Sequence, residues 1–206
     1  MFSSYSGIDY VYILITVVLS LSIHEAIHAY AAHALGDTTA QDMGRLSLNP
    51  LKHIDPYMTV LLPIITLLIF KVPFLAAKPV PFNPNRVKFG EFGGAIIAAA
   101  GPLSNLALAF IPVLLLRFVP VNGGLYEFLR IFVTLNVAIF VFNILPIPPL
   151  DGSRVLYAFS PEPMQDFMRK IEPYGLFIII ALVLTGALST VIIGLDNYFI
   201  NLLVSV

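Results

Sequence analysis

Four long stretches of this chain carry almost no charged residues, and they limit its fold more than any other feature. The stretches are Val11–Leu35, Phe92–Phe118, Phe128–Leu145 and Tyr174–Leu195. A helix needs roughly 20 apolar residues to cross a bilayer core about 30 Å thick, so each stretch predicts a spanning helix. Of the 206 residues, 58% are hydrophobic and only 11% are charged, whereas soluble domains average about 25% charged. The sequence therefore predicts an all-α polytopic membrane protein with about four spanning helices.

Composition excludes several other classes of protein. The chain has no cysteine, which excludes a disulfide-stabilised scaffold and thiolate metal ligands. Its net charge of −1 gives no indication of a nucleic-acid partner. At this length we expect a single domain over residues 1–206.

A fifth apolar stretch, Tyr57–Phe70, is too short for an ordinary span and contains Pro63. It predicts a re-entrant segment that enters the membrane and returns on the same side. Alternation of residue types around Ala77–Phe82 allows a short strand or a small β-hairpin next to it. Further along, Glu162–Glu172 has the pattern of an amphipathic helix lying at the membrane surface.

The first predicted span contains His24-Glu25-Ala26-Ile27-His28, an HExxH pattern. On a helix, His24 and His28 lie one turn apart, so both imidazoles can reach one metal ion while Glu25 sits beside it. This arrangement supplies two zinc ligands and one general base acting on water. Ionisable groups inside a membrane helix are costly unless they serve a site or a partner, which favours the metal site over a merely structural polar cluster.

A catalytic zinc site normally has three protein ligands, and the best third ligand is Asp151. It follows an apolar helix that a proline cluster breaks, so the chain beyond can fold back towards a cavity. Gly152 permits a tight turn directly after the carboxylate. The alternative is an aspartate that caps a helix from Ser153 onward. Zinc is favoured over cobalt or iron because it is the more available metal for such ligands.

Other polar residues allow more than one interpretation. His33 lies on the opposite side of the helix from His24, so it cannot join the same site. His53 follows in a loop, where it is a ligand, a substrate contact or a structural residue. Asn105 and Asn136 are expected to hold helices together, the alternative being a role in the site.

Together these motifs resemble the site-2 protease family, the membrane-embedded zinc metalloproteases of regulated intramembrane proteolysis. The resemblance rests on HExxH in a membrane helix, on Ala100–Asn105 opening a later helix, and on Asn143–Gly152 closing another. Gly44–Pro50 and Ala77–Pro81 resemble a compact bacterial subgroup, and we expect no PDZ or CBS domain. The resemblance implies one zinc ion per chain, and it also implies a role for each of several residues around that ion. The implied zinc ligands are His24, His28 and Asp151, the implied catalytic base is Glu25, and the implied substrate or oxyanion contact is Asn143.

The metal site also predicts a topology. His24 and His28 lie in the second half of their helix and Asp151 follows the end of its own, so both helices run towards one membrane face, here called the zinc side. Phe92–Phe118 must then start on that side. Nine basic residues fall on the zinc side and two on the other, which places the zinc side in the cytoplasm and the N-terminus outside. The nine are Arg45, Lys52, Lys71, Lys78, Arg86, Lys88, Arg154, Arg169 and Lys170, and the two are Arg117 and Arg130.

The sequence thus predicts a zinc metalloendopeptidase of the cell membrane that hydrolyses peptide bonds within or beside transmembrane segments of other membrane proteins. Because a helical substrate hides its carbonyls in hydrogen bonds, it must unwind, and Lys71–Phe82 is expected to receive it as an added strand. The alternatives are an ion or metal transporter that uses intramembrane His and Asp, and an inactive relative that binds transmembrane partners. Membrane lipid is the other expected partner.

Overall fold

The structure is a computed structural model that describes residues 6–53, 57, 61, 65 and 80–205. Every regular element within these residues is helical, in agreement with the all-α prediction. The α-helices are α1 (Gly7–Ala34), α2 (Thr39–Asp42), α4 (Glu91–Phe118), α5 (Gly123–Ile144), α6 (Asp151–Phe159), α7 (Glu162–Ile171), α8 (Gly175–Leu184) and α9 (Ala187–Ser205). Short 3-10 turns are η2 (Pro50–Lys52), η4 (Pro84–Arg86) and η5 (Glu172–Tyr174).

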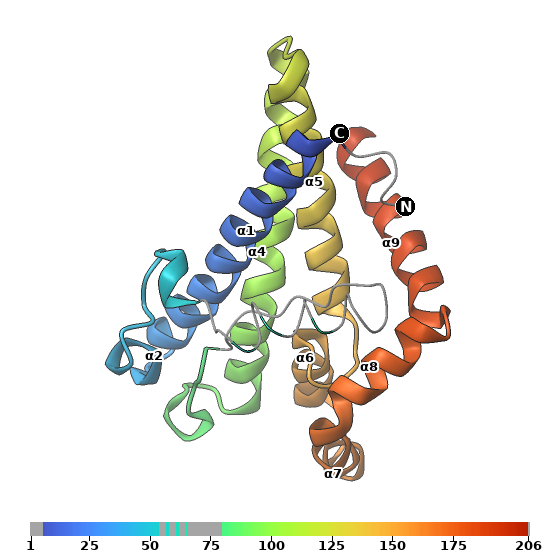
Figure 1. Ribbon diagram of the computed structural model, residues 1–206. Helices are drawn as coiled ribbons and strands as arrows, with labels where there is room; N and C mark the ends of the chain where they lie inside the picture. Colours follow the sequence, from blue (N-terminus) through green and yellow to red (C-terminus); the bar gives the residue numbers. More distant parts are fainter. Residues whose placement is uncertain (1–5, 54–56, 58–60, 62–64, 66–79, 206) are drawn as a thin grey trace.

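Helices α1, α4 and α5 pack together at the centre of the molecule (Figure 1). In that view α1 and α5 descend and α4 rises, so α1 and α5 end at the same, lower end of the molecule. Each of the three is long and apolar enough to cross a membrane. The first three predicted spans are therefore confirmed as long apolar helices with the predicted relative directions.

The fourth predicted span, Tyr174–Leu195, is helical on both sides of a break rather than continuous. Helix α8 ends at Leu184, α9 begins at Ala187, and the helical runs on either side of this break meet at 82°. Gly186 lies in the break with a φ of 74°, a conformation that glycine adopts without steric cost. The described residues thus contain three candidate spans, or four if the bent pair counts as one.

The smaller predicted elements differ in outcome. The amphipathic helix predicted over Glu162–Glu172 is confirmed as α7. Most of the predicted re-entrant segment Tyr57–Phe70 lies outside the described residues. The first half of the predicted hairpin around Ala77–Phe82 also lies outside the described residues, and its described half, Val80–Phe82, is not in a strand. The hairpin is therefore not supported.

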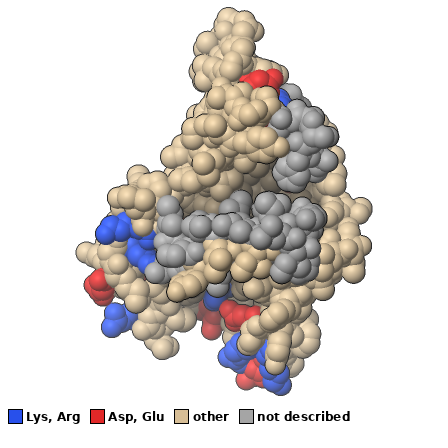
Figure 2. Space-filling model, in the orientation of Figure 1, with Lys and Arg blue, Asp and Glu red and all other residues tan. Residues whose placement is uncertain are grey.

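Helix α4 holds the central helices together, because it packs against α1, α5 and α6. Helix α5 also packs against α9, through Phe140 and Phe199, and the centres of these two rings lie 5.0 Å apart in an edge-to-face arrangement. Large apolar side chains such as Leu14, Ile111 and Phe177 are more than half exposed, as expected for surfaces that face lipid. On the face shown in Figure 2, charged side chains gather mainly at the lower end, around α2 and below α6. The apolar helices and the end-weighted charge together indicate a membrane protein.

Candidate active site

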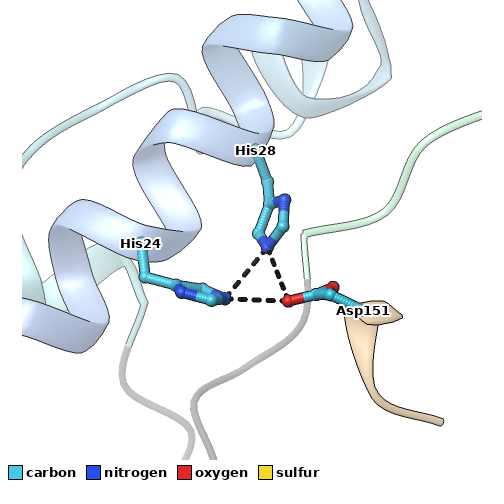
Figure 3. A group of neighbouring side chains, drawn as sticks. All are labelled: His24, His28 and Asp151. Atoms are coloured by element: carbon cyan, nitrogen blue, oxygen red, sulfur yellow. Dashed lines mark hydrogen bonds and ion pairs between the residues drawn. The ribbon is translucent and has the colours of Figure 1, made fainter. Parts of the chain in front are cut away.

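Helix α1 presents His24 and His28 from adjacent turns towards the same point (Figure 3). Their Nε2 atoms lie 3.0 Å apart. Both residues are buried, with 4% and 9% of their surface exposed. The helical spacing predicted from HExxH therefore brings the two imidazole nitrogens together.

Asp151 reaches the same point from the first turn of α6. Its Oδ2 lies 3.2 Å from His24 Nε2 and 3.3 Å from His28 Nε2 (Figure 3). Helix α6 begins at Asp151 itself and its N-cap residue is Leu150, so Asp151 is not the residue that caps this helix. A side chain at Gly152 would overlap the carbonyl of Ile144, so this glycine lets the chain fold back tightly between α5 and α6.

The three candidate ligand atoms have a spacing and a chemistry that fit a zinc ion. Tetrahedral ligands about 2.0–2.1 Å from zinc lie about 3.3 Å from one another. The separations here are 3.0, 3.2 and 3.3 Å. Two imidazole nitrogens and one carboxylate oxygen are also a ligand set that zinc accepts. Of the residues that the structure describes, these three form the group of His, Cys, Asp and Glu side chains close enough to hold a metal ion.

Hydrogen bonds on the far side of each imidazole favour this use. His28 Nδ1 donates to the backbone carbonyl of Ile97 at 2.7 Å, and His24 Nδ1 lies 2.6 Å from Asn105 Oδ1. A histidine that donates from Nδ1 leaves the lone pair of Nε2 for a metal, and such partners are usual at metal-binding histidines. Asn105 also donates to Asn136 at 3.0 Å, so it both links helices and contacts the site.

Close packing of α4 against α1 shapes the site at Gly101. A Cβ on this residue would overlap the His28 imidazole and would lie 2.8 Å from His24 Nε2. The small residues of α4 therefore do more than permit helix packing, because one of them makes the room that both imidazoles occupy.

Glu25 lies beside the two histidines and is 9% exposed. Its carboxylate interacts electrostatically with His24, His28 and Asp151. The backbone N–H of Val80 donates to Glu25 Oε2 at 3.0 Å, which holds the carboxylate in one orientation. Glu25 therefore interacts with all three residues of the cluster while its carboxylate is held by Val80, an arrangement compatible with a general base.

Asp37 fastens the segment that carries Val80 to the end of α1. This fully buried carboxylate accepts hydrogen bonds from the Thr39 hydroxyl at 2.6 Å and from the Asn83 N–H at 2.7 Å. Burial acts to raise the pKa of Asp37, but these hydrogen bonds outweigh it and hold the pKa below its usual range. No local sequence pattern singles out Asp37, because its partner at Asn83 is distant in the chain.

A cavity of about 230 Å³ lies next to α6. Phe82, Ser153 and Arg154 are among its lining residues. Arg154 pairs with Glu172 at 3.0 Å and lies 5.6 Å from the centre of the Phe82 ring. The cavity therefore borders both the helix that carries Asp151 and the segment that follows Val80.

In the part of the chain described, the hydrogen bonds of His53 and Asn143 are made to backbone carbonyls outside the cluster of His24, His28 and Asp151. His53 is buried, and its Nε2 donates to the Ser47 carbonyl at 2.7 Å within its own loop. Asn143 donates from Nδ2 to the Ile139 carbonyl at 2.9 Å, one turn back in α5. His33 is exposed near the end of α1. The substrate-contact roles suggested for His53 and Asn143 remain predictions.

Comparisons with known proteins point to one family. A model of peptidase family M50 matches residues 119–186, which include Asn143 and Asp151. The Bacillus subtilis (strain 168) protein named "Putative zinc metalloprotease YwhC" is 39% identical over 183 residues, covering 84% of this chain and 80% of that protein. "Putative zinc metalloprotease Rip2" of Mycolicibacterium smegmatis is 28% identical over 203 residues, covering 96% and 76%. No solved structure gives a significant match.

The similarity to the Bacillus protein extends over most of both chains, and the match to the family model includes the turn that carries Asp151. The HExxH helix and the convergence of His24, His28 and Asp151 agree with a zinc metalloprotease. This chain belongs to peptidase family M50, the site-2 protease family.

Proposed function

We propose that this protein is an intramembrane zinc metalloendopeptidase that hydrolyses peptide bonds within or next to transmembrane segments of other membrane proteins. In this proposal His24, His28 and Asp151 hold one zinc ion and Glu25 is the catalytic base. The observation that carries the proposal is the approach of three ligand atoms to within 3.0–3.3 Å, with Glu25 beside them, among helices apolar enough to span a membrane. The names of the relatives support zinc and proteolysis.

When bound, zinc would supply a Lewis acid that lowers the pKa of water towards about 7 and polarises a carbonyl. The residues of the chain account for the proton transfers. Glu25 accepts a proton from the attacking water and later delivers it to the leaving amine. The Val80 N–H keeps the Glu25 carboxylate oriented during both transfers. The cavity beside α6 is our candidate for the route by which water arrives.

The substrate and the orientation in the membrane are part of the same proposal. A transmembrane segment must unwind before its carbonyls are accessible. We propose that Lys71–Phe82, most of which lies outside the described residues, receives it as an added strand. Replacing Lys78–Val80 should then reduce cleavage of a model substrate, and unchanged cleavage would contradict this step. We further propose that the protein lies in the cell membrane, with the site nearer the cytosolic face and the N-terminus outside.

Cleavage of a model transmembrane peptide in liposomes tests the proposal. Wild type should cleave it, lose activity when a chelator removes the metal, and recover activity when zinc returns. Asp151→Ala should weaken zinc binding by about 100-fold or more, because it removes one of three ligands, and it should abolish cleavage. Asp166→Ala, which removes a surface carboxylate paired with Arg169, is the matched control and should remain active. Full cleavage after complete removal of metal would overturn the proposal.

The same liposomes distinguish the alternative functions. A metal transporter would move zinc into liposomes without cleaving any peptide, whereas the proposed enzyme cleaves without zinc flux. An inactive relative would bind the peptide and leave it intact. Buried ionisable groups spread along a path would favour transport. In the described residues His24, His28 and Asp151 instead meet at one point, which favours hydrolysis.

A further inference from the structure

A chain of hydrogen bonds connects the candidate metal site to the middle of α5. It begins at the backbone carbonyl of Phe132, which accepts from Asn136 Nδ2 at 2.9 Å. Asn136 Oδ1 accepts from Asn105 Nδ2 at 3.0 Å. Asn105 Oδ1 lies 2.6 Å from His24 Nδ1. Both asparagines are completely buried, so their amides have no exposure to solvent.

The Phe132 carbonyl determines which group donates and which accepts in each of these hydrogen bonds. A backbone carbonyl only accepts hydrogen bonds, so Asn136 must present its NH₂ group to Phe132 and its oxygen to Asn105. Asn105 must therefore present its own NH₂ group to Asn136 and its oxygen to His24. That oxygen also only accepts, so His24 must carry a proton on Nδ1. The lone pair of His24 is then on Nε2, the atom that faces His28 and Asp151.

We infer that Asn136 is a positioning residue, which acts through Asn105 to fix the proton of His24 on Nδ1 and so to present Nε2 to the metal. The inference rests on the proposed zinc site. Asn136 belongs neither to the HExxH motif nor to the Asp151 motif, and it reaches His24 only through Asn105. Orienting His24 is a role for this buried asparagine that helix packing alone does not require.

A second, weaker anchor sets the size of the expected effect. Asn105 Nδ2 also lies 3.4 Å from the Ser20 carbonyl, near the limit for a hydrogen bond. If Asn136 is replaced, this weak contact would still favour the orientation of the Asn105 amide in which Nδ2 faces Ser20 and Oδ1 faces His24. Direct partners of metal-binding histidines are worth about 10- to 100-fold in metal affinity, so we expect about 5-fold for Asn136, which acts one bond further out.

Three variants of α5 test the inference. Asn136→Leu keeps the branched shape of the side chain but removes both hydrogen bonds. Asn136→Asp keeps an oxygen towards Asn105, and burial favours its neutral acid, whose OH group can donate to Phe132 in place of the amide. Thr134→Val is the matched control, because Thr134 also bonds to a carbonyl one turn back, at Arg130, but is exposed and has no part in the chain. If Asn136→Leu does not fold, Asn136→Ala replaces it.

The first measurement is zinc affinity by competition with a chelator, and the second is the NMR resonance of the His24 Nδ1–H in zinc-loaded, ¹⁵N-histidine-labelled protein. Wild type should show a strongly hydrogen-bonded Nδ1–H, assigned by its loss in His24→Gln. Asn136→Leu should bind zinc about 5-fold more weakly and exchange this proton faster. Asn136→Asp and Thr134→Val should resemble wild type in both measurements.

The outcomes separate this inference from the proposed function. If wild type binds no zinc, the proposed function fails and this inference fails with it. If wild type binds zinc but Asn136→Leu changes neither zinc affinity nor the His24 resonance, only this inference is overturned. Failure of Asn136→Asp to restore both values would also overturn it, because loss of packing at this position would then explain the effect. Neither measurement depends on peptide cleavage.

Discussion

The backbone N–H of Val80 donates a hydrogen bond to Glu25 Oε2 at 3.0 Å, which joins a loop to the HExxH helix across 55 positions of sequence. Val80→Pro should remove this donor while keeping the extended conformation that the following proline already favours. We expect cleavage to fall by about 10- to 100-fold, since one hydrogen bond to a charged group is worth about 1.5–3 kcal/mol. Zinc content should not change. Val80→Ala keeps the N–H and should retain activity, and equal activity of the two variants would contradict this role.

Gly101 and Gly94 form a matched pair on α4. A Cβ at Gly101 would overlap the His28 imidazole, whereas a Cβ at Gly94 would meet nothing within 4 Å. Gly101→Ala should lose zinc and destabilise the protein by about 1–3 kcal/mol, because α1 and α4 must separate. Gly94→Ala should keep zinc and be slightly more stable, by about 0.5–1 kcal/mol. Zinc content and thermal unfolding in detergent measure both, and normal zinc binding by Gly101→Ala would show that the site is placed wrongly.

Asp37 should make stability depend on pH in a defined direction. Burial acts to raise the pKa of its carboxyl, and the stronger hydrogen bonds from Thr39 and Asn83 lower the pKa below its unfolded value. The ionised carboxylate therefore stabilises the folded state above about pH 4, and this contribution is lost as the pH falls through the folded-state pKa.

Asp37→Asn should therefore lower stability by about 1–3 kcal/mol at neutral pH, because it places an NH₂ group or a weaker acceptor against N–H donors. The difference from wild type should shrink below about pH 4. Thermal unfolding followed by circular dichroism at both pH values measures it. Asp42→Asn, which removes a carboxylate that accepts from the Thr38 hydroxyl at the surface, is the control. A difference that grows towards acid pH would contradict the assignment.

The proposed orientation can be tested with single cysteines, because the chain contains none of its own. Asn122 is exposed between α4 and α5, and Lys170 is exposed near the end of α7, at the opposite end of the molecule. In intact cells an impermeant maleimide should label Asn122→Cys at once and Lys170→Cys only after the membrane is opened. The reverse pattern would place the candidate site nearer the outer face.

HExxH is a local pattern, so helical geometry alone predicts that His24 and His28 lie together, as they do in the structure. Few acids border the apolar helices, which singles out Asp151 as the candidate third ligand. The bond between Asn105 and His24 could not be predicted, because a buried asparagine must find a partner but the sequence does not say on which helix. The same limit applies to Asp37 and Asn83, which meet only after the chain has folded.

In the fold, hydropathy identified three long helices but not the break between α8 and α9. Thr185 and Gly186 lie in a stretch that is mostly apolar, so its mean hydropathy does not reveal a break at these two residues. A glycine in the left-handed conformation changes the direction of the backbone without changing its polarity. Length and composition therefore predicted how much helix this region contains and not that the helix is bent.

The most direct test of the central claim compares Glu25→Gln with wild type in one experiment that records zinc content and peptide cleavage together. The substitution keeps the shape of the side chain and its acceptor for Val80 but removes the base. Zinc content should equal that of wild type, and cleavage should fall by at least about 100-fold, the contribution of general base catalysis. A Glu25→Gln protein that holds zinc and cleaves at the wild-type rate would contradict the account.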